Sequence, residues 1–138
     1  VHMPQQDIIA GRSGELLDWL DRHAFPAELR YADRDFARIK AETFINELFS
    51  AGTTCAQVFS TVHRHACESL FVAASTKKMC LVAGKVMMDR NAPVNLLQNA
   101  ADCREDTESL IEEWHGRGRL RYALTPRFAV TSSEEQLS

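Results

Sequence analysis

The chain has 138 residues and a mass of 15.6 kDa, which is enough for one domain with a packed core. Hydrophobic residues make up 45% and charged residues 25%, a balance typical of a globular protein and too apolar for intrinsic disorder. The net charge of −3 offers no basic surface for nucleic acid. No apolar run approaches the ~18 residues of a membrane helix, and the first residues lack a signal-peptide pattern. We therefore expect no nucleic-acid or membrane partner and a cytoplasmic location.

Four cysteines are present, and none belongs to a CxxC pair. Their neighbours are mostly apolar, so the pattern favours free thiols that are buried or half-buried in a reducing compartment. A disulfide framework or a zinc knuckle is the less favoured alternative. The four residues are Cys55, Cys67, Cys80 and Cys103.

Apolar spacing predicts two helices in the first third of the chain. The first runs from residue 13 to about 23, with Leu16, Leu17 and Leu20 on its apolar side, and Pro26 closes it. The second covers 33–51, with an aspartate as N-cap and a glycine after its last residue. Its apolar stripe consists of Ala37, Ala41, Phe44, Ile45 and Leu48.

Short strands alternate with further helices over the rest of the chain. Strands are predicted at 53–59, 79–83 and 120–124, and the apolar run at 79–83 is typical of a strand buried on both faces of a parallel sheet. Helices are predicted at about 66–75, from Pro93 onward with Val94, Leu97 and Ala101 inward, and up to Trp114, before Gly116 and Gly118. This alternation predicts an α/β fold with parallel strands.

Functional groups gather at the carboxyl ends of strands in such folds, so the residues after each strand are the candidates. These are 60–63, 85–90, 125–128 and, as the end of an earlier strand, 1–5. The strongest metal-like pattern is the pair His63 and His65, although polar residues that open a helix explain it better. Phosphate-binding loops and nucleophile elbows lack their motifs. Composition and spacing alone therefore do not define a reaction.

Several stretches, in order from residue 1 to 136, resemble the guanine deaminases of the metal-dependent amidohydrolase superfamily. VHMPQ resembles the end of that family's His-x-His-x-Pro-Gln element, and ELLDWL followed by Phe-Pro resembles the next helix and turn. KVMMDRNAP and TPRFA are the sequence motifs most specific for this resemblance. These stretches lie at 1–5, 15–20, 25–26, 52–54, 85–93, 125–129 and 131–133.

The resemblance implies a fold and a reaction. The fold would be a (β/α)8 TIM barrel beside a small β-sandwich, and residues 1–138 would form about the first half of that catalytic barrel domain, because a complete barrel takes roughly 250 residues. The reaction would be zinc-dependent hydrolytic deamination of guanine to xanthine and ammonia, as in purine catabolism or salvage. The proton-shuttling glutamate and most zinc ligands would lie outside this chain, so we expect no catalytic residue within it and no activity from it alone.

The resemblance also assigns roles to single residues. His2 would be a zinc ligand beside the substrate, the second histidine of the first-strand pair. Gln5 would hydrogen-bond the purine edge, Arg127 would donate to the purine carbonyl, and Phe128 would pack on the ring plane. His63 would at most support a ligand.

The implied partners are guanine and, in the full enzyme, a second copy in a homodimer. Two other hypotheses stay open. The protein would act on another aminated heterocycle if residues 5 and 127 recognise a different base, or it would be a non-catalytic α/β binding module.

Overall fold

The structure is a computed structural model that describes residues 1–9, 11 and 14–137. Its strands pair in parallel in two small sheets that follow one another along the strand direction. The first sheet has the order β1 (Cys55–Phe59), β2 (Cys80–Gly84) and β4 (Leu120–Tyr122). The second pairs β3 (Val86–Met87) with β5 (Thr125–Pro126). The β2–β4 pair is therefore continued, after a short interruption, by the β3–β5 pair.

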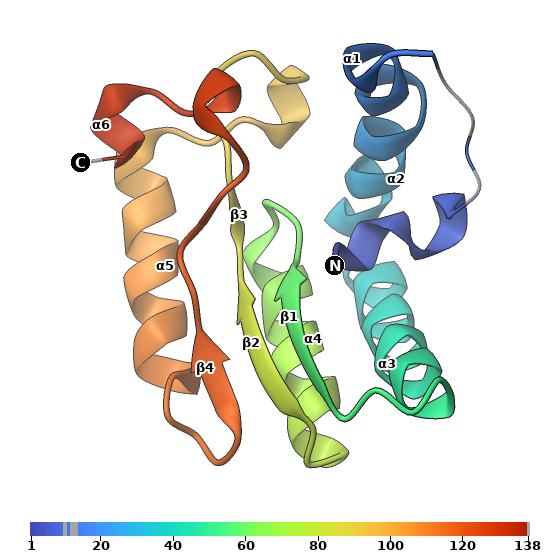
Figure 1. Cartoon of the computed structure of the whole chain (residues 1–138). Helices are drawn as coiled ribbons and strands as arrows, with labels where there is room; N and C mark the ends of the chain where they lie inside the picture. Colours follow the sequence, from blue (N-terminus) through green and yellow to red (C-terminus); the bar gives the residue numbers. More distant parts are fainter. Residues whose placement is uncertain (10, 12–13, 138) are drawn as a thin grey trace.

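Three long helices cover one face of the first sheet. Helix α4 (Arg64–Thr76) and helix α5 (Ala100–Trp114) lie against the strands, and α3 (Arg34–Ser50) packs on α4 (Figure 1). Within the described part of the chain, no helix is long and apolar enough to cross a membrane. The shorter elements are 3-10 turns at Met3–Ile8, Arg30–Ala32, Val94–Leu96 and Ala129–Thr131, a π-helix at Leu20–Ala24, and α-helices α1 (Leu16–Trp19), α2 (Phe25–Leu29) and α6 (Glu134–Leu137).

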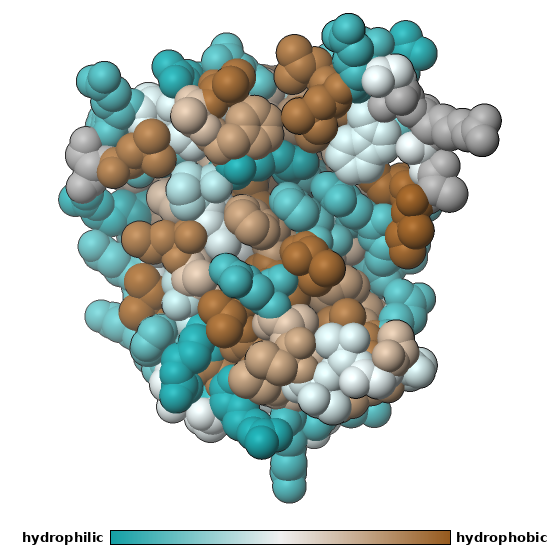
Figure 2. Space-filling view, viewed as in Figure 1, coloured by the Kyte–Doolittle hydropathy of each residue, from teal (hydrophilic) through white to brown (hydrophobic). Residues whose placement is uncertain are grey.

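The main core lies between the sheet and these helices. Leu81, Ala83 and Leu120 point toward the helices and are buried. On the opposite face Cys80 and Val82 are only half-buried, so the prediction that the 79–83 run is buried on both faces is wrong for this chain. Odd positions of β2 face the helices, whereas Cys80 and Val82 face the other way and stay partly open to solvent. Figure 2 shows apolar and polar side chains mixed on the side of the molecule that faces the viewer in Figure 1.

Local sequence signals locate the long helices α3 and α4 correctly. The Asp33 carboxylate accepts a hydrogen bond from the Phe36 backbone N–H at 2.8 Å, as an N-cap should. Gly52 has a φ of +78°, the left-handed conformation that ends a helix most easily at glycine. The predicted apolar side of α4 is fully buried, and it consists of Cys67, Leu70, Phe71 and Ala74.

Two helix predictions are wrong in detail. Pro26 does not close a helix but lies in the first turn of α2, where a missing N–H leaves no helical hydrogen bond unmade. Leu16 and Leu17 are 66% and 63% exposed, because α1 has only four residues before the backbone widens into a π-helix. The predicted start at residue 13 lies outside the described residues.

The helix predicted from Pro93 is only a short 3-10 turn, and Val94 is 78% exposed. Helix α5 begins later, at Ala100, because the Asn99 side chain caps it by accepting from the Asp102 N–H at 2.8 Å. Its predicted end at Trp114 is confirmed. The stronger cap therefore sets the start of this helix, rather than the proline.

Gly84 is the last residue of β2, and the backbone segment that follows β4 lies too close to it to leave room for a side chain. A Cβ atom there would lie 2.0 Å from the Ala123 carbonyl oxygen and 2.8 Å from Thr125 Oγ1. This close approach lets β2 and β4 continue into the β3–β5 pair. A glycine inside an apolar strand is a sequence signal for such an approach.

We predict that Gly84→Ala lowers the free energy of unfolding of the full-length protein by about 3 kcal/mol or more, because backbone must move to admit the methyl group. The urea midpoint of unfolding measures this loss. Gly14→Ala is the matched control, since a Cβ at Gly14 meets no atom within 4 Å. Equal midpoints for the two variants would contradict the prediction.

Candidate active site

The first residues of the chain form the end of a further parallel strand beside β1. His2 pairs with Phe59, the Phe59 backbone N–H donates to the Val1 carbonyl at 2.9 Å, and the Val1 backbone nitrogen donates to the Gln57 carbonyl at 3.0 Å. The 3-10 turn Met3–Ile8 follows at once, with Pro4 in its first turn. This parallel bridge agrees with the prediction that residues 1–5 follow the end of a strand.

His2 has the environment that a metal-binding histidine needs. Its ring stacks on Phe59, with centroids 4.6 Å apart and planes 10° apart. Among the described residues its buried Nδ1 has no hydrogen-bond partner. Burial, and next the positive charge of Arg127, lower the pKa of His2 to about 4. The imidazole is therefore neutral at neutral pH, which is the form that binds a metal ion.

Gln5 lies one helical turn after His2 and is half-buried. Both residues line a hollow of about 360 Å³ that Phe44 and Leu48 of α3 close from the other side. The neighbouring Gln6 has a structural role, because its amide donates to the Tyr31 hydroxyl at 3.0 Å. The sequence places two glutamines in this turn, and the structure leaves Gln5 beside His2.

Arg127 lies on the sheet face that the helices do not cover. Residues at even positions of β4, Leu120 and Tyr122, face the helices, so odd positions face the other way. The Arg127 guanidinium forms an ion pair with Glu28 of α2, and their side chains are 3% and 0% exposed. Burial raises the pKa of Glu28, while the nearby guanidinium acts to lower it. The Phe25 ring centroid lies 5.4 Å from the guanidinium carbon.

Phe128 is half-buried in a second, smaller apolar cluster. This cluster lies at the carboxyl ends of the strands and joins residues of the 60s and 80s to the first helices. Its buried members are Leu20, Ala24, Phe25, Val62, Val86, Met88 and Leu96. The predicted substrate residues Arg127 and Phe128 therefore share one region with Phe25 and the strand ends.

The backbone around Arg127 is fixed by the second strand pair. Val86 pairs with Thr125, and Met87 pairs with Pro126. The Arg127 N–H donates to the Met87 carbonyl at 3.2 Å, and the Thr125 hydroxyl donates to the Lys85 carbonyl at 2.7 Å.

Side chains of residues 89–91 hold the segment that follows Phe128. Asp89 accepts from the Ser133 N–H at 2.8 Å and also from its hydroxyl. Arg90 donates to the Ala129 carbonyl at 2.8 Å, and Asn91 donates to the Val130 carbonyl at 2.7 Å. The two most specific sequence motifs, 85–93 and 125–129, are thus joined to each other by hydrogen bonds. Sequence reasoning assigned no role to Asp89 or Arg90.

Lys85 is a completely buried lysine on the helix side of the sheet. Its ammonium donates to the Gln98 side-chain oxygen and lies 3.5 Å from Cys103 Sγ and 3.6 Å from Asp106. These partners belong to α5 and to the segment before it. Lys85 therefore fastens α5 to the end of β2 and does not face His2.

The histidine pair at 63 and 65 stands at the start of α4, and each ring contacts a neighbouring group. His63 is the residue before α4, and the Thr61 hydroxyl lies 3.1 Å from its Nδ1. His65 donates from Nε2 to the Tyr31 carbonyl at 2.8 Å. Burial and the neighbouring His65 lower the pKa of His63 to about 4. Because α4 begins at Arg64 with His63 as its N-cap residue, the interpretation of this pair as polar residues opening a helix is confirmed.

The cysteines are free thiols, as predicted. Cys67 and Cys103 are buried, whereas Cys55 is exposed rather than buried or half-buried, because it begins β1 on the uncovered face. Cys55 and Cys80 are register partners on neighbouring strands, with sulfur atoms 3.2 Å apart.

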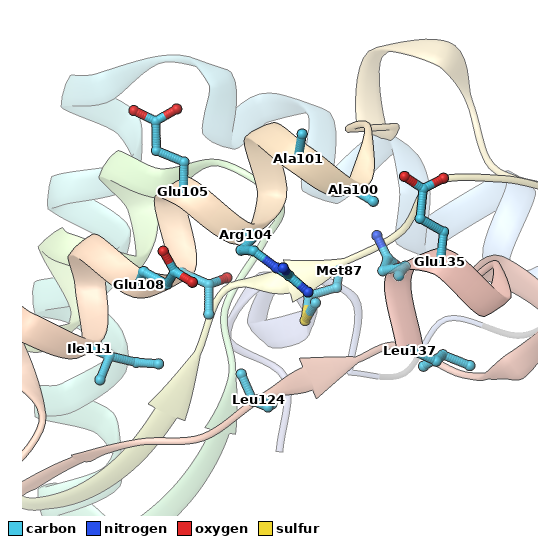
Figure 3. A pocket seen from close by; sticks show the side chains of 12 residues that line it. Met87, Ala100, Ala101, Arg104, Glu105, Glu108, Ile111, Leu124, Glu135 and Leu137 are labelled. Atoms are coloured by element: carbon cyan, nitrogen blue, oxygen red, sulfur yellow. The ribbon is translucent and has the colours of Figure 1, made fainter.

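A larger hollow of about 840 Å³ lies on the other side of the molecule, between α5 and α6 (Figure 3). Met87, Leu124 and Glu135 line it, and Arg104 and Glu108 extend into it. It shares no residue with the group around His2 and Arg127. Size therefore does not identify the site here, whereas the position at the strand ends does.

The fold and the residues at the strand ends define a class of protein, and sequence comparison agrees. The chain belongs to the amidohydrolase family, whose profile matches residues 1–138. It is similar to the guanine deaminase of Escherichia coli (strain K12), with 49% identity over 138 residues, which are 100% of this chain and 31% of that protein. The chain thus spans about a third of the length of this curated relative.

Solved structures give the same result. Guanine deaminase from Bradyrhizobium japonicum matches with a TM-score of 0.96 and 38% identity, over 99% of this chain and 30% of that one. Guanine deaminase from C. acetobutylicum, solved with guanine bound in the active site, matches with a TM-score of 0.93 and 29% identity, over 99% and 33%. The predicted fold class, parallel strands and helices as in part of an amidohydrolase (β/α)8 barrel, is confirmed by these likenesses.

We predict that Asp89→Ala releases residues 129–133 from the 89–91 segment. The Ser133 N–H loses its acceptor, which costs about 1–3 kcal/mol. Hydrogen exchange of peptides covering 129–137 in the full-length protein measures this, and exchange should rise about tenfold or more. Asp35→Ala is the control, because the Asp35 side chain is 90% exposed. Unchanged protection in the Asp89 variant would show that the β3–β5 pair holds the segment alone.

Proposed function

We propose that the full-length protein carrying this chain is a zinc-dependent guanine deaminase, which converts guanine and water to xanthine and ammonia. The observation that carries the proposal is that His2 and Arg127 each lie at the carboxyl end of a parallel strand, in a chain 49% identical to a guanine deaminase. A relative of the same fold holds guanine in its active site. In this proposal residues 1–138 form part of the catalytic barrel domain.

His2 would be one ligand of the zinc ion. Its neutral imidazole and its unpartnered buried nitrogen suit that role, and the remaining ligands would come from other parts of the full-length protein. A bound zinc ion supplies a water whose pKa falls toward ~7, so hydroxide is available at neutral pH. The Phe59 ring, stacked on His2, fixes the plane of the imidazole.

The purine would be recognised by Gln5, Arg127 and Phe128. A carboxamide offers both a donor and an acceptor, as the mixed edge of guanine requires. The Arg127 guanidinium would donate to the purine carbonyl and stabilise negative charge that develops on the ring when water adds. Phe128 would pack against the ring plane.

Two further features belong to the proposal. Free thiols and the family relationship support a cytoplasmic location. A homodimer is proposed from the resemblance to family enzymes alone.

We predict that His2→Ala sharply lowers the zinc content of the full-length protein. The double variant His63→Ala and His65→Ala should keep the wild-type content, because these rings bind Thr61 and the Tyr31 carbonyl. Elemental analysis of both variants, purified side by side, measures the zinc per chain. The reverse pattern would move the metal site to the end of β1.

We predict that Arg127→Ala lowers kcat/KM for guanine roughly 30- to 1,000-fold. This factor corresponds to a loss of about 2–4 kcal/mol of transition-state stabilisation. Zinc content should not change, since Arg127 is not a ligand. Arg38→Ala is the control, because Arg38 lies on α3 and its side chain is 55% exposed. Ammonia release is measured with guanine and with adenine and cytosine as competing bases. Activity of the wild type on one of those bases alone would favour a different amidohydrolase.

A further inference from the structure

We propose that Glu28 is a positioning residue for substrate recognition: its carboxylate holds the Arg127 guanidinium in the direction from which it donates to the purine carbonyl. This inference rests on the proposed function and adds a residue that the sequence analysis did not identify. Glu28 itself does not touch the substrate in this proposal.

The contact joins two distant parts of the chain. Glu28 lies in α2, and its Oε1 accepts from Arg127 Nη1 across 99 residues of sequence. Both side chains are almost completely withdrawn from solvent, at 0% and 3% exposure. A buried charge-assisted hydrogen bond of this kind restricts a side chain far more than an exposed ion pair does.

Helix α2 presents two groups to the guanidinium. Phe25 and Glu28 are three residues apart, so they lie on the same side of the helix. The Phe25 ring lies 5.4 Å from the guanidinium carbon, and the Glu28 carboxylate binds one of its nitrogens. Ring and carboxylate together fix both the plane and the direction of the Arg127 side chain.

The geometry leaves donors for a ligand. A guanidinium has five N–H groups, and the contact with Glu28 is made through Nη1. Among the described residues no second side-chain acceptor contacts this guanidinium, so its other N–H groups can donate to a carbonyl oxygen. His2 pairs with Phe59 at the end of β1, and Arg127 directly follows β5, so both residues lie at the carboxyl ends of parallel strands, where the purine is proposed to bind.

Stability alone explains this pair poorly. Moving a carboxylate and a guanidinium out of water costs several kcal/mol for each ion, and apolar side chains of similar size often join two elements equally well. The second oxygen of Glu28, Oε2, is buried without a hydrogen-bond partner among the described residues. A fixed arginine has a clear advantage at a binding site, because its rotamers are already restricted before the ligand arrives.

The test is a double-mutant cycle in the full-length protein with guanine as substrate. The variants are Glu28→Gln, Arg127→Ala and the double variant, with Asp21→Asn as the control, since Asp21 is an exposed carboxylate on the preceding helical stretch. We expect Glu28→Gln to lower kcat/KM about 10- to 100-fold with unchanged zinc content. In the Arg127→Ala background the same change should alter kcat/KM less than twofold, because its effect passes through Arg127.

A conservative variant covers the case in which Glu28→Gln fails to fold. Glu28→Asp keeps the negative charge but shortens the side chain by one methylene. We expect kcat/KM for guanine to fall roughly three- to tenfold. Zinc content should be normal, and the melting temperature should stay within a few degrees of the wild-type value. Equal losses for Glu28→Gln in both backgrounds, or wild-type kinetics for both Glu28 variants, would overturn the positioning role. A wild-type protein that does not deaminate guanine would instead overturn the proposed function, and this inference would fall with it.

Discussion

Parallel pairing of the strands decides where the candidate site residues His2 and Arg127 lie. It brings the carboxyl ends of all strands to one edge and gives alternate residues the same face. The helix-facing positions form the core, as Leu81 and Leu120 show. The other face receives His2, Phe59 and Arg127 although they come from three separate parts of the sequence. The same pairing depends on Gly84, because any side chain there would strike the neighbouring backbone.

The site around Arg127 has two layers of support. Backbone pairing of β3 with β5 sets the position of residue 127, and the side chains of Asp89 and Asn91 hold the segment after it. Helix α2 then fixes the arginine side chain through Glu28. The chain thus contains one metal-binding candidate, one charged substrate-binding candidate and the scaffold that orients both, over about a third of the length of its relatives.

The sequence predicts features whose signals are local. Asp33, Gly52 and the apolar stripes locate α3 and α4, because caps and periodicity act within a few residues. Leu16 and Pro26 mislead for the opposite reason, since surrounding structure decides how a short helix packs and where a proline is tolerated. Glu28 and Asp89 are not recognisable from the sequence, because their partners lie 99 and 44 residues away. The resemblance supplied His2 and Arg127 but not the residues that orient them.

The interlock between residues 85–91 and 125–133 also sets an order of events during synthesis. Asp89 leaves the ribosome 44 residues before Ser133, its hydrogen-bond partner. At translation rates of ~5–20 residues per second, the loop after β3 waits about 2–9 seconds for the segment that completes it. Met88 is fully buried in the folded chain, and during that time it has not yet packed against its final neighbours. A translational pause between these two segments therefore prolongs the exposure of an apolar strand end to chaperones and to other nascent chains.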